Sequence, residues 1–444
     1  VLFHEDRSFS KSVLEVPVEG TQITIFREGD YHAYREMVDG VRKTLKRWCS
    51  HSETEITFED RSPSGGDFPE LETINEPFEV EGQCAARVEV PGTEIALAYS
   101  FEPIYGFYNR GLTLALTDVG DQVFNEARSN RFRRISVKIK SRYLEHTLSR
   151  ETVMRDENYE KAMELLDRGV EGKLQENLVG EIEELVGRPA WGLPEMDAYA
   201  TLTAFLLSEP DESLLRVFKR NLFRGVHGEA LTPADLWNAF GSDGRVMIAE
   251  KPTDLSREVK ALGVPVVLGL SPVLESSQGS LAKHPLEQVF RLVGRFLVAK
   301  RKVTITGRVK SMLGWDLFSG LWQTMTAPED VYLHVKLDDR VPDDVAPFIR
   351  SAHKLLKKIN SGFKKIQTFS WTDAEGVPPM FVTGRKLDRL MTKPPPGTSV
   401  EGKKPEAAVH RNHEQFQALF SLYQRSPQLA SYMLAKSLLL RCLL

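Results

Sequence analysis

The segment RISVKIKSRYLEHTLSRETVMRDENYEKAMELL, residues 134–166, contains a strand pattern, a loop and a helix pattern in succession. Its first part alternates apolar and polar residues, which predicts a strand with one buried face and one solvated face. The buried face holds Ile135, Val137 and Ile139, and the solvated face holds Ser136, Lys138 and Lys140. Its last part repeats apolar residues at helical spacing, and the predicted buried stripe contains Tyr159, Ala162 and Leu166.

The predicted start of this helix gives Arg150 an unusual position. Thr147 and Ser149 are both possible N-caps, so Arg150 lies in the predicted first helical turn. The helix dipole disfavours a cation at that end. Two interpretations stay open: an ordinary surface arginine, or a guanidinium that meets an anionic group, such as a phosphate, delivered from elsewhere.

Strand and helix patterns continue on both sides of this segment. Residues 19–48 pass from a turn glycine through a strand with Ile23 and Ile25 into a helix with Met37, Val41 and Leu45. Residues 54–60 and 86–116 show further strand patterns. RVMIAE, DLSREVKAL and VPVVLGLS, within residues 245–271, form a strand–helix–strand unit with parallel strands. We therefore expect a mixed α/β (α+β) fold.

The later part of the chain suggests where its segments divide. We predict a helix at 284–299, strands KVTITGRV (302–309) and VYLHVKL (331–337), and a basic helix in 353–365. The stretch KPPPGTSVEGKKPEA (393–407) predicts a linker. We divide the chain into residues 1–50, 51–175, 176–392, a linker at 393–408, and a mostly helical segment at 409–444.

Composition excludes several classes of partner. The 444 residues include 58 basic and 62 acidic ones, and the net charge of −4 gives no overall attraction to nucleic acid or to an anionic membrane. No run of about 18 uncharged apolar residues occurs, so we expect no membrane-spanning helix. Cys49, Cys84 and Cys442 lie far apart and form no CxxC pair, which favours a reducing compartment. We expect a cytoplasmic protein.

Short motifs elsewhere in the sequence are weaker evidence for a functional site. TDVGD (117–121) is most simply an ordinary turn, and HRNHE (410–414) a solvated helix start. The lysines in residues 353–365 could contact an acidic partner, although a solvated helix face is the commoner explanation. No P-loop, G-x-G-x-x-G or G-x-S-x-G motif occurs. We expect no metal site in this chain.

Three segments together resemble the heat-shock protein 90 family of GHKL ATPases, and within it the divergent bacterial members. GTQITIFREGDYHAYREMVDGVRKTLKRW (20–48) is similar to the last strand of the family's nucleotide domain and its exit helix. GFYNRGLTL (106–114) resembles the middle-domain strand with its Y-x-R core. YLEHTLSRETVMRD (143–156) resembles the loop and helix carrying the L-S-R-E tetrad. Order and spacing match over roughly residues 15–170, and residues 413–440 also resemble the end of such proteins.

This resemblance implies roles for two residues. Arg150 matches the tetrad arginine, which reaches from the middle domain to the γ-phosphate of ATP, so it is implied to be catalytic and cofactor-binding. Thr21 matches the threonine on the strand that lines the adenine pocket, and is implied to be cofactor-binding. The family's polar residue four positions after the arginine is Met154 here, and its common asparagine three positions before is Thr147. The secondary contacts of this loop are therefore expected to differ.

The resemblance also implies an architecture. Residues 1–50 would be the terminal strand and exit helix of a nucleotide domain, and residues 51–175 a ribosomal-protein-S5-domain-2-like middle domain. A smaller α/β segment and a helical C-terminal dimerisation region would follow. The family's E-x-x-x-N-x-x-D helix and D-x-G-x-G turn precede the Gly-Thr strand, and only 19 residues precede Gly20 here. We therefore expect ATP and Mg²⁺ to be bound by a domain outside this sequence, and expect ATP hydrolysis only where that domain is present.

The implied function is that of a stress-response molecular chaperone that acts on client or partner proteins as a homodimer. The expected dimer contacts are apolar residues of the C-terminal helices: Leu419, Phe420, Tyr423, Leu429, Met433, Leu438 and Leu439. Plain core packing of these residues is an equal alternative. Two other functions stay open, a nucleotide-independent interaction scaffold that has lost the ATPase domain, and another GHKL machine in defence or DNA remodelling. The sequence does not identify the client or the pathway.

Overall fold

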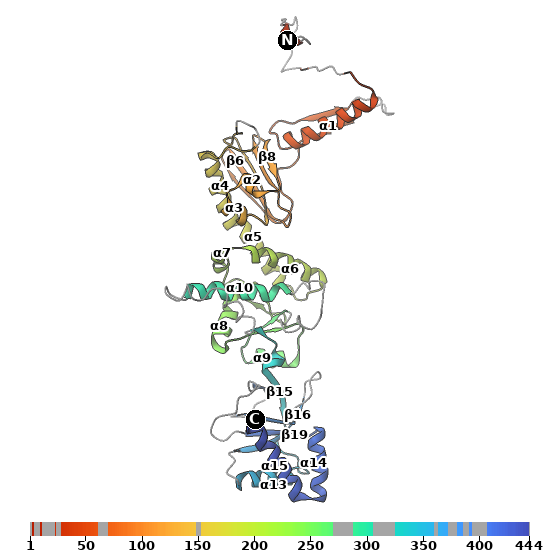
Figure 1. The fold of residues 1–444 in the computed structure, drawn as a ribbon, viewed down its shortest axis with the longest axis vertical. Helices are drawn as coiled ribbons and strands as arrows, with labels where there is room; N and C mark the ends of the chain where they lie inside the picture. The colour runs from red at the N-terminus through yellow and green to blue at the C-terminus, as the bar shows by residue number, and fades with distance from the viewer. Residues whose placement is uncertain are drawn as a thin grey trace.

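The protein has a mixed α/β fold, seen here in a computed structural model (Figure 1). The structure describes residues 2–3, 9–10, 23, 28–60, 70–147, 152–269, 287–304, 325–358, 363–371, 380–384, 390–392 and 406–443. In Figure 1 α1 lies near one end of the long axis, the first five-stranded sheet and the helices of the middle part follow, and α13–α15 lie at the other end. The mixed class predicted from the sequence is confirmed.

The N-terminal part consists of two small strand pairs and a long helix. β1 (Leu2–Phe3) pairs with β2 (Phe9–Ser10), and β3 (Thr57–Asp60) pairs with β4 (Glu70–Thr73), both antiparallel. Between them lies α1 (Tyr31–Cys49), whose N-cap Asp30 accepts a hydrogen bond from the Ala33 amide. Val38 is the one buried residue of this amphipathic helix. Two residues of its apolar stripe, Val41 and Trp48, are exposed.

A five-stranded sheet follows, with strand order β5-β6-β9-β7-β8. Its strands are β5 (Gln83–Val90), β6 (Thr93–Tyr99), β7 (Tyr105–Asn109), β8 (Leu112–Thr117) and β9 (Ile135–Ser141). β7 and β9 are parallel, and the other neighbours are antiparallel. β9 lies in the centre of this sheet, so the alternating segment read from the sequence is its middle strand.

One face of this sheet forms the main core and the other is only partly covered. Ile135, Val137 and Ile139 are buried in the main core, as predicted. On the opposite face Ser136 is also buried, and Lys138 and Lys140 are half-buried. This face is therefore less solvated than the alternation predicts, because the chain around residues 51 and 78 packs over it.

Helices cover the main-core face. α2 (Gly120–Val123) and α3 (Glu126–Arg131) lie between β8 and β9, and α4 (Glu157–Gly169), the π-helical turn η1 (Val170–Leu174) and α5 (Gln175–Gly187) follow β9. Tyr159, Ala162 and Leu166 are buried, which confirms the predicted stripe of α4. The Tyr159 hydroxyl donates to the carbonyl of Val123 at 2.5 Å, so α4 is fastened to the end of α2.

The middle of the chain is mostly helical around a small parallel sheet. Its helices are α6 (Leu193–Ser208), α7 (Asp211–Arg216), α8 (Pro233–Asp243), α9 (Asp254–Ala261), α10 (Glu287–Thr304) and α12 (Pro328–Val331). β10 (Phe223–Arg224) pairs with β11 (Ala230–Leu231), and β12 (Val246–Ala249) lies between β13 (Val266–Leu268) and β14 (Met325–Thr326). β12 and β13 are parallel, which confirms the predicted unit.

The C-terminal part has its own core and its own sheet, with order β17-β19-β16-β15-β18. The strands are β15 (Tyr332–Leu337), β16 (Lys365–Trp371), β17 (Phe381–Gly384), β18 (Leu390–Thr392) and β19 (Glu406–His410). The helices are α13 (Ala346–Lys358), α14 (Glu414–Arg425) and α15 (Pro427–Leu443). None of the helices in the described part of the chain is long and apolar enough to span a bilayer.

Two predicted boundaries differ from the structure. The predicted strand at 302–309 is wrong over its first three residues, because α10 continues through Thr304 and Lys302 pairs with Asp211 at 2.7 Å. The predicted linker at 393–408 is wrong at its end, because β19 begins at Glu406 and lies between β16 and β17. The predicted C-terminal segment at 409–444 therefore shares a sheet and a core with residues before the linker.

Candidate functional site

The two residues predicted from the family resemblance, Thr21 and Arg150, lie outside the described residues. Their roles stay predictions. The chain on both sides of residues 148–151 is described, however, and it fixes where the segment carrying Arg150 leaves and rejoins the fold.

The predicted start of α4 is wrong. α4 begins at Glu157, with Asp156 as its N-cap, and the Asp156 carboxylate accepts from the Tyr159 amide at 2.9 Å. Residues 152–155 precede the helix and include an isolated antiparallel bridge between His146 and Val153. Seven positions thus separate Arg150 from the first helical residue. Because the first turn begins beyond Arg150, the dipole argument that first distinguished this arginine does not apply.

The two ends of the segment are fastened together. The Thr147 amide donates to the carbonyl of Thr152 at 3.0 Å, and the Met154 amide donates to the carbonyl of Glu145 at 2.8 Å. Val153 is buried in the main core. Four residues, including Arg150, connect these pinned ends.

Two exposed arginines lie at the same end of the sheet. β7 and β9 are parallel neighbours, so the residues that follow them lie at one edge. Arg110 follows β7 and Arg142 follows β9, and both are exposed. The Asn109 side chain donates to the carbonyl of Leu144 at 2.6 Å and joins the two chain segments. The pinned loop therefore starts beside a locally basic edge.

The β7–β8 turn explains how Arg110 is placed there. Arg110 and Gly111 have φ values of 48° and 84°, as a two-residue type I′ hairpin turn requires. A Cβ at Gly111 would lie 1.6 Å from the carbonyl oxygen of His51, so only glycine fits this position. The sequence Asn-Arg-Gly thus presents Arg110 at the tip of the turn and brings His51 against the sheet.

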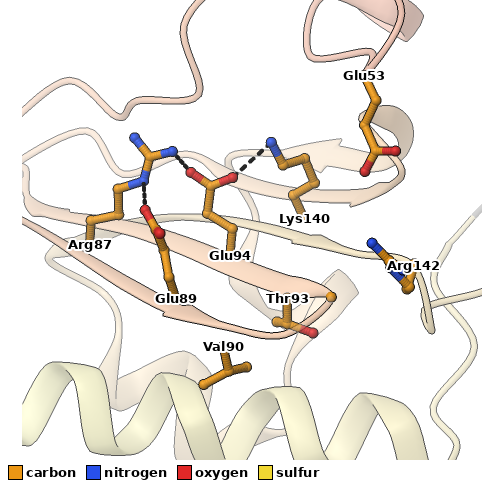
Figure 2. Close-up of a pocket in the computed structure, with 9 residues that line it drawn as sticks. Glu53, Arg87, Glu89, Val90, Thr93, Glu94, Lys140 and Arg142 are labelled. Atoms are coloured by element: carbon orange, nitrogen blue, oxygen red, sulfur yellow. Dashed lines mark ion pairs between the residues drawn. The ribbon is translucent and has the colours of Figure 1, made fainter.

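A small charged pocket lies at this edge (Figure 2). Its volume is about 280 Å³, and Glu53, Arg87, Glu89, Val90, Gly92, Thr93, Glu94, Lys140 and Arg142 line it. Glu94 pairs with Arg87 and, at 2.7 Å, with Lys140, and Arg87 also pairs with Glu89 at 2.7 Å. These pairs neutralise most of the pocket and tie β5, β6 and β9 together.

Arg142 stands apart from this network. Figure 2 shows Arg142 and Glu53 away from the dashed ion pairs that join the other charged residues. No ion-pair partner of the Arg142 guanidinium occurs in the described ranges. Burial, and then the neighbouring Arg87, lower the pKa of Lys140, whose ammonium lies 4.7 Å from the centre of the Phe78 ring. Arg142 is thus the cation of this pocket best placed to meet an external anion.

A larger cleft of about 1090 Å³ lies at the opposite end of the sheet. Its walls come from residues 76–82 and from the β6–β7 connection, and its carboxylates are Glu76, Glu79, Glu81, Glu102 and Asp118. Lys138 is the one cation among the lining residues. Its ammonium lies 3.1 Å from Nε2 of His51, a buried side chain.

These cavities do not fit a nucleotide. The small pocket has an internally neutralised lining, and the large cleft has an acidic one that would repel phosphates. Among the described residues no group of three or more histidine, cysteine, aspartate or glutamate residues could hold a metal ion.

Comparison with known proteins adds no assignment. No model of a known protein family matches the chain, and no curated protein matches its sequence.

Sequence reasoning missed Arg142 and the pair formed by His51 and Lys138. The alternation placed Lys138 and Lys140 on the solvated face of the strand, where lysine is an ordinary residue, so it gave no signal of a site. The partner of Lys138 could not be identified in this way, because His51 is 87 residues away in sequence.

Proposed function

We propose that this chain is the middle and C-terminal part of a heat-shock protein 90-like, ATP-driven chaperone dimer. Arg150 supplies a positive charge to the γ-phosphate of ATP held, with Mg²⁺, by a nucleotide domain outside this chain. The observation that carries the proposal is the pinned loop: Thr147 and Thr152 hold its ends at the basic edge of a rigid sheet. The described ends thus fix where the segment that carries Arg150 leaves and rejoins the fold.

The charge of the sheet edge supports the same function. Arg110 and Arg142 follow the carboxyl ends of two parallel strands, and both are exposed. A terminal phosphate carries concentrated negative charge, and guanidinium groups bind it by paired N–H donors. Two such groups beside the loop favour the approach of a phosphate from another domain.

An uncovered helix supports a domain contact on the N-terminal side. α1 carries an apolar stripe in which Val41 and Trp48 are 42% and 40% exposed. An amphipathic helix normally buries such a stripe. We propose that the nucleotide domain, which α1 leaves in the family that the chain resembles, covers it.

The C-terminal helix supports a homodimer. Leu434 and Leu438 on one face of α15 are buried in the C-terminal core. Four apolar residues of this helix are exposed: Leu429, Tyr432, Met433 and Leu440. Burial of both faces requires a second surface, and we propose that α15 of another copy provides it. Client proteins remain the proposed substrates of the dimer.

The proposed role of Arg150 is tested in a chain extended by its nucleotide domain. If Arg150 contacts the γ-phosphate as the transition state forms, Arg150→Ala should lower ATP turnover by roughly ten- to a thousand-fold, about 1.4 to 4 kcal/mol, with nearly unchanged nucleotide affinity. Arg150→Lys should restore little activity, because an ammonium cannot reproduce the planar two-donor guanidinium.

The matched control is Lys161→Ala, which removes an exposed cation on α4 that pairs with Glu157 of the same helix. Its turnover should equal that of the unmodified protein. Normal turnover in Arg150→Ala, or an equal loss in Lys161→Ala, would contradict the proposed function.

A further inference from the structure

The floor of the acidic cleft holds a lysine and a histidine in direct contact. Lys138 projects from the central strand β9, and its Nζ lies 3.1 Å from Nε2 of His51. The lysine side chain is half-buried and lines the cleft of about 1090 Å³. Its amine is thus reachable by a small molecule that enters the cleft.

The surroundings of His51 fix which ring nitrogen can take up a proton. Nδ1 lies 3.2 Å from the carbonyl oxygen of Glu76, which can only accept, so Nδ1 carries the hydrogen. Nε2 therefore has its lone pair directed at Lys138. The ring is held by edge contacts to Phe78 and Tyr108, with centroids 5.2 and 4.9 Å away. His51 is a fixed proton acceptor for the lysine.

The electrostatic setting of Lys138 is mixed. Burial is the largest effect and lowers the pKa of its amine, while the carboxylates of Glu76, Glu81 and Glu79 act in the opposite direction. Burial and the neighbouring Lys138 also lower the pKa of His51, so the imidazole is neutral and able to accept. A desolvated lysine beside a base is the arrangement that activates amines as nucleophiles.

We propose that Lys138 is a covalent modification site, at which its amine forms a Schiff base with small uncharged aldehydes and His51 accepts the proton. The five carboxylates of the cleft disfavour anionic aldehydes, so the reactive class is neutral. This site is separate from the proposed contact of Arg150 with ATP.

The chemistry balances without an oxidant or a reductant. The ammonium first gives one proton to Nε2 of His51, and the amine nitrogen then attacks the carbonyl carbon to form a C–N bond. Proton transfer within the adduct gives a neutral carbinolamine. The imidazolium returns its proton to the hydroxyl group, the C–O bond breaks and water leaves. The product is a protonated imine, which carries the single positive charge that the ammonium carried before.

The chain supplies two matched reference lysines. Lys140 lies two residues farther along β9 and is half-buried, but its ammonium pairs with Glu94 at 2.7 Å. Lys161 is exposed and pairs with Glu157 at 2.8 Å, a contact that raises the pKa of Lys161. Within the described residues, neither lysine contacts a histidine as Lys138 does. We expect the order of reactivity Lys138, then Lys140, then Lys161.

The test uses the full chain and ¹³C-formaldehyde with sodium cyanoborohydride, which traps each imine as a stable methylamine. Peptide mass spectrometry then gives an initial rate for each lysine at neutral pH. Lys138 should react about tenfold or more faster than Lys161, a threshold set below the roughly hundredfold effect at the lower end for a positioned base. Equal rates for these two lysines in the folded protein would overturn the proposal.

Two further arms test the base and the charge selectivity. His51→Gln keeps a hydrogen-bond acceptor but removes the proton acceptor, so the rate of Lys138 should fall to that of Lys161 in a variant with an unchanged melting curve. An unchanged rate would exclude His51 as the base. If this variant does not fold, the ratio of the Lys138 and Lys161 rates in the unmodified protein decides the test alone.

The charge of the aldehyde is tested separately. Replacing formaldehyde by anionic glyoxylate should reduce the preference for Lys138 several-fold. An unchanged preference would contradict the proposed neutral class of aldehyde.

Discussion

Arg155 lies five positions after Arg150, close enough to share its apparent role, but its contacts are structural. Its guanidinium donates to the backbone carbonyls of Phe124 at 3.1 Å and Gln122 at 3.4 Å. These bonds connect the end of the pinned loop to α2. An arginine fixed in this way is not available to a ligand. The contacts of Arg155, and not its distance from Arg150 in the sequence, therefore define its role.

Arg155→Ala should therefore act on stability. We expect a loss of about 1 kcal/mol in the free energy of unfolding, because two carbonyl groups lose a charged donor at a partly exposed site. Arg142→Ala, which removes an exposed arginine from the same edge, should change stability by less than about 0.5 kcal/mol. Chemical denaturation of both variants measures the difference. A larger loss in Arg142→Ala would show that the small pocket depends on that residue.

The buried carboxyl of Glu209 should make the stability of the protein depend on pH. It is buried and accepts from the Tyr99 hydroxyl at 2.7 Å. Burial raises its pKa, so the folded state binds the proton more tightly than the unfolded state. Stability associated with this carboxyl is therefore greatest at low pH and decreases as pH rises through the raised pKa. At neutral pH the ionised form of this buried carboxyl therefore lowers the free energy of unfolding.

Glu209→Gln should consequently melt at the same temperature as the unmodified protein or higher at about pH 7.5. The amide keeps an acceptor for Tyr99 and removes the buried charge. This advantage should shrink as the pH is lowered toward the raised pKa of Glu209, because the unmodified carboxyl then takes up its proton. Glu212→Gln, an exposed neighbour, should show no such trend. A lower melting temperature at both pH values would mean that the ionised carboxylate is needed.

At the scale of elements, strands and helices were predictable from the sequence where burial of one face determines the residue pattern. The alternation of β9 and the stripe of α4 follow from one buried face each, and both are confirmed. Thr232 begins α8 with a capping box that involves Asp235, as its sequence indicates. These features are local, so the residues themselves contain the information.

Errors occurred where distant contacts override local preference. Val303 and Thr304 are β-branched, but they complete α10, which Arg295 and Lys302 tie to Asp211 of α7. Glu406 follows a Pro-rich stretch, but β19 gains a full ladder with β16. The start of α4 was misplaced because the Thr147–Thr152 contact and the Asp156 cap compete with an earlier start. The partners of α10 and β19 lie outside a local window, whereas the competing contacts at α4 are local.

The dimer prediction belongs to α15. Truncation before this helix is a poor test, because it would also remove Ala430, Leu434 and Leu438 from the C-terminal core. The double substitution Tyr432→Lys and Met433→Glu instead places charges on the exposed face alone. Light scattering should give a dimer for the unmodified chain and a monomer for the variant, with little change in melting temperature. Gln424→Glu on α14 is the control and should stay dimeric.

At the scale of the whole molecule, the described parts form successive units. The first sheet and the helices around it share one core, and the C-terminal sheet and helices have another. In Figure 1 the two units lie at different positions along the long axis. This order leaves the uncovered stripes of α1 and α15 far apart in the chain, so each needs its own partner.

The last prediction concerns what completes the N-terminal end. The present chain should show no micromolar binding of ATP with Mg²⁺ by calorimetry, because the described cavities are neutralised or acidic. A chain extended upstream by the nucleotide domain should bind ATP and should also cover the stripe of α1. Trp48 is 40% exposed, so burying it should shift its fluorescence to shorter wavelength.

The chain contains six tryptophans, so the signal of Trp48 must be isolated by subtracting the spectrum of Trp48→Phe in each chain. A difference spectrum that moves to shorter wavelength only in the extended chain supports a domain seated on α1. If ATP binds to the extended chain while Trp48 stays exposed, a nucleotide domain is present but does not pack on this helix. Micromolar ATP binding by the present chain alone would instead contradict the proposal that a separate domain binds the nucleotide. The nucleotide would then have a site within these 444 residues.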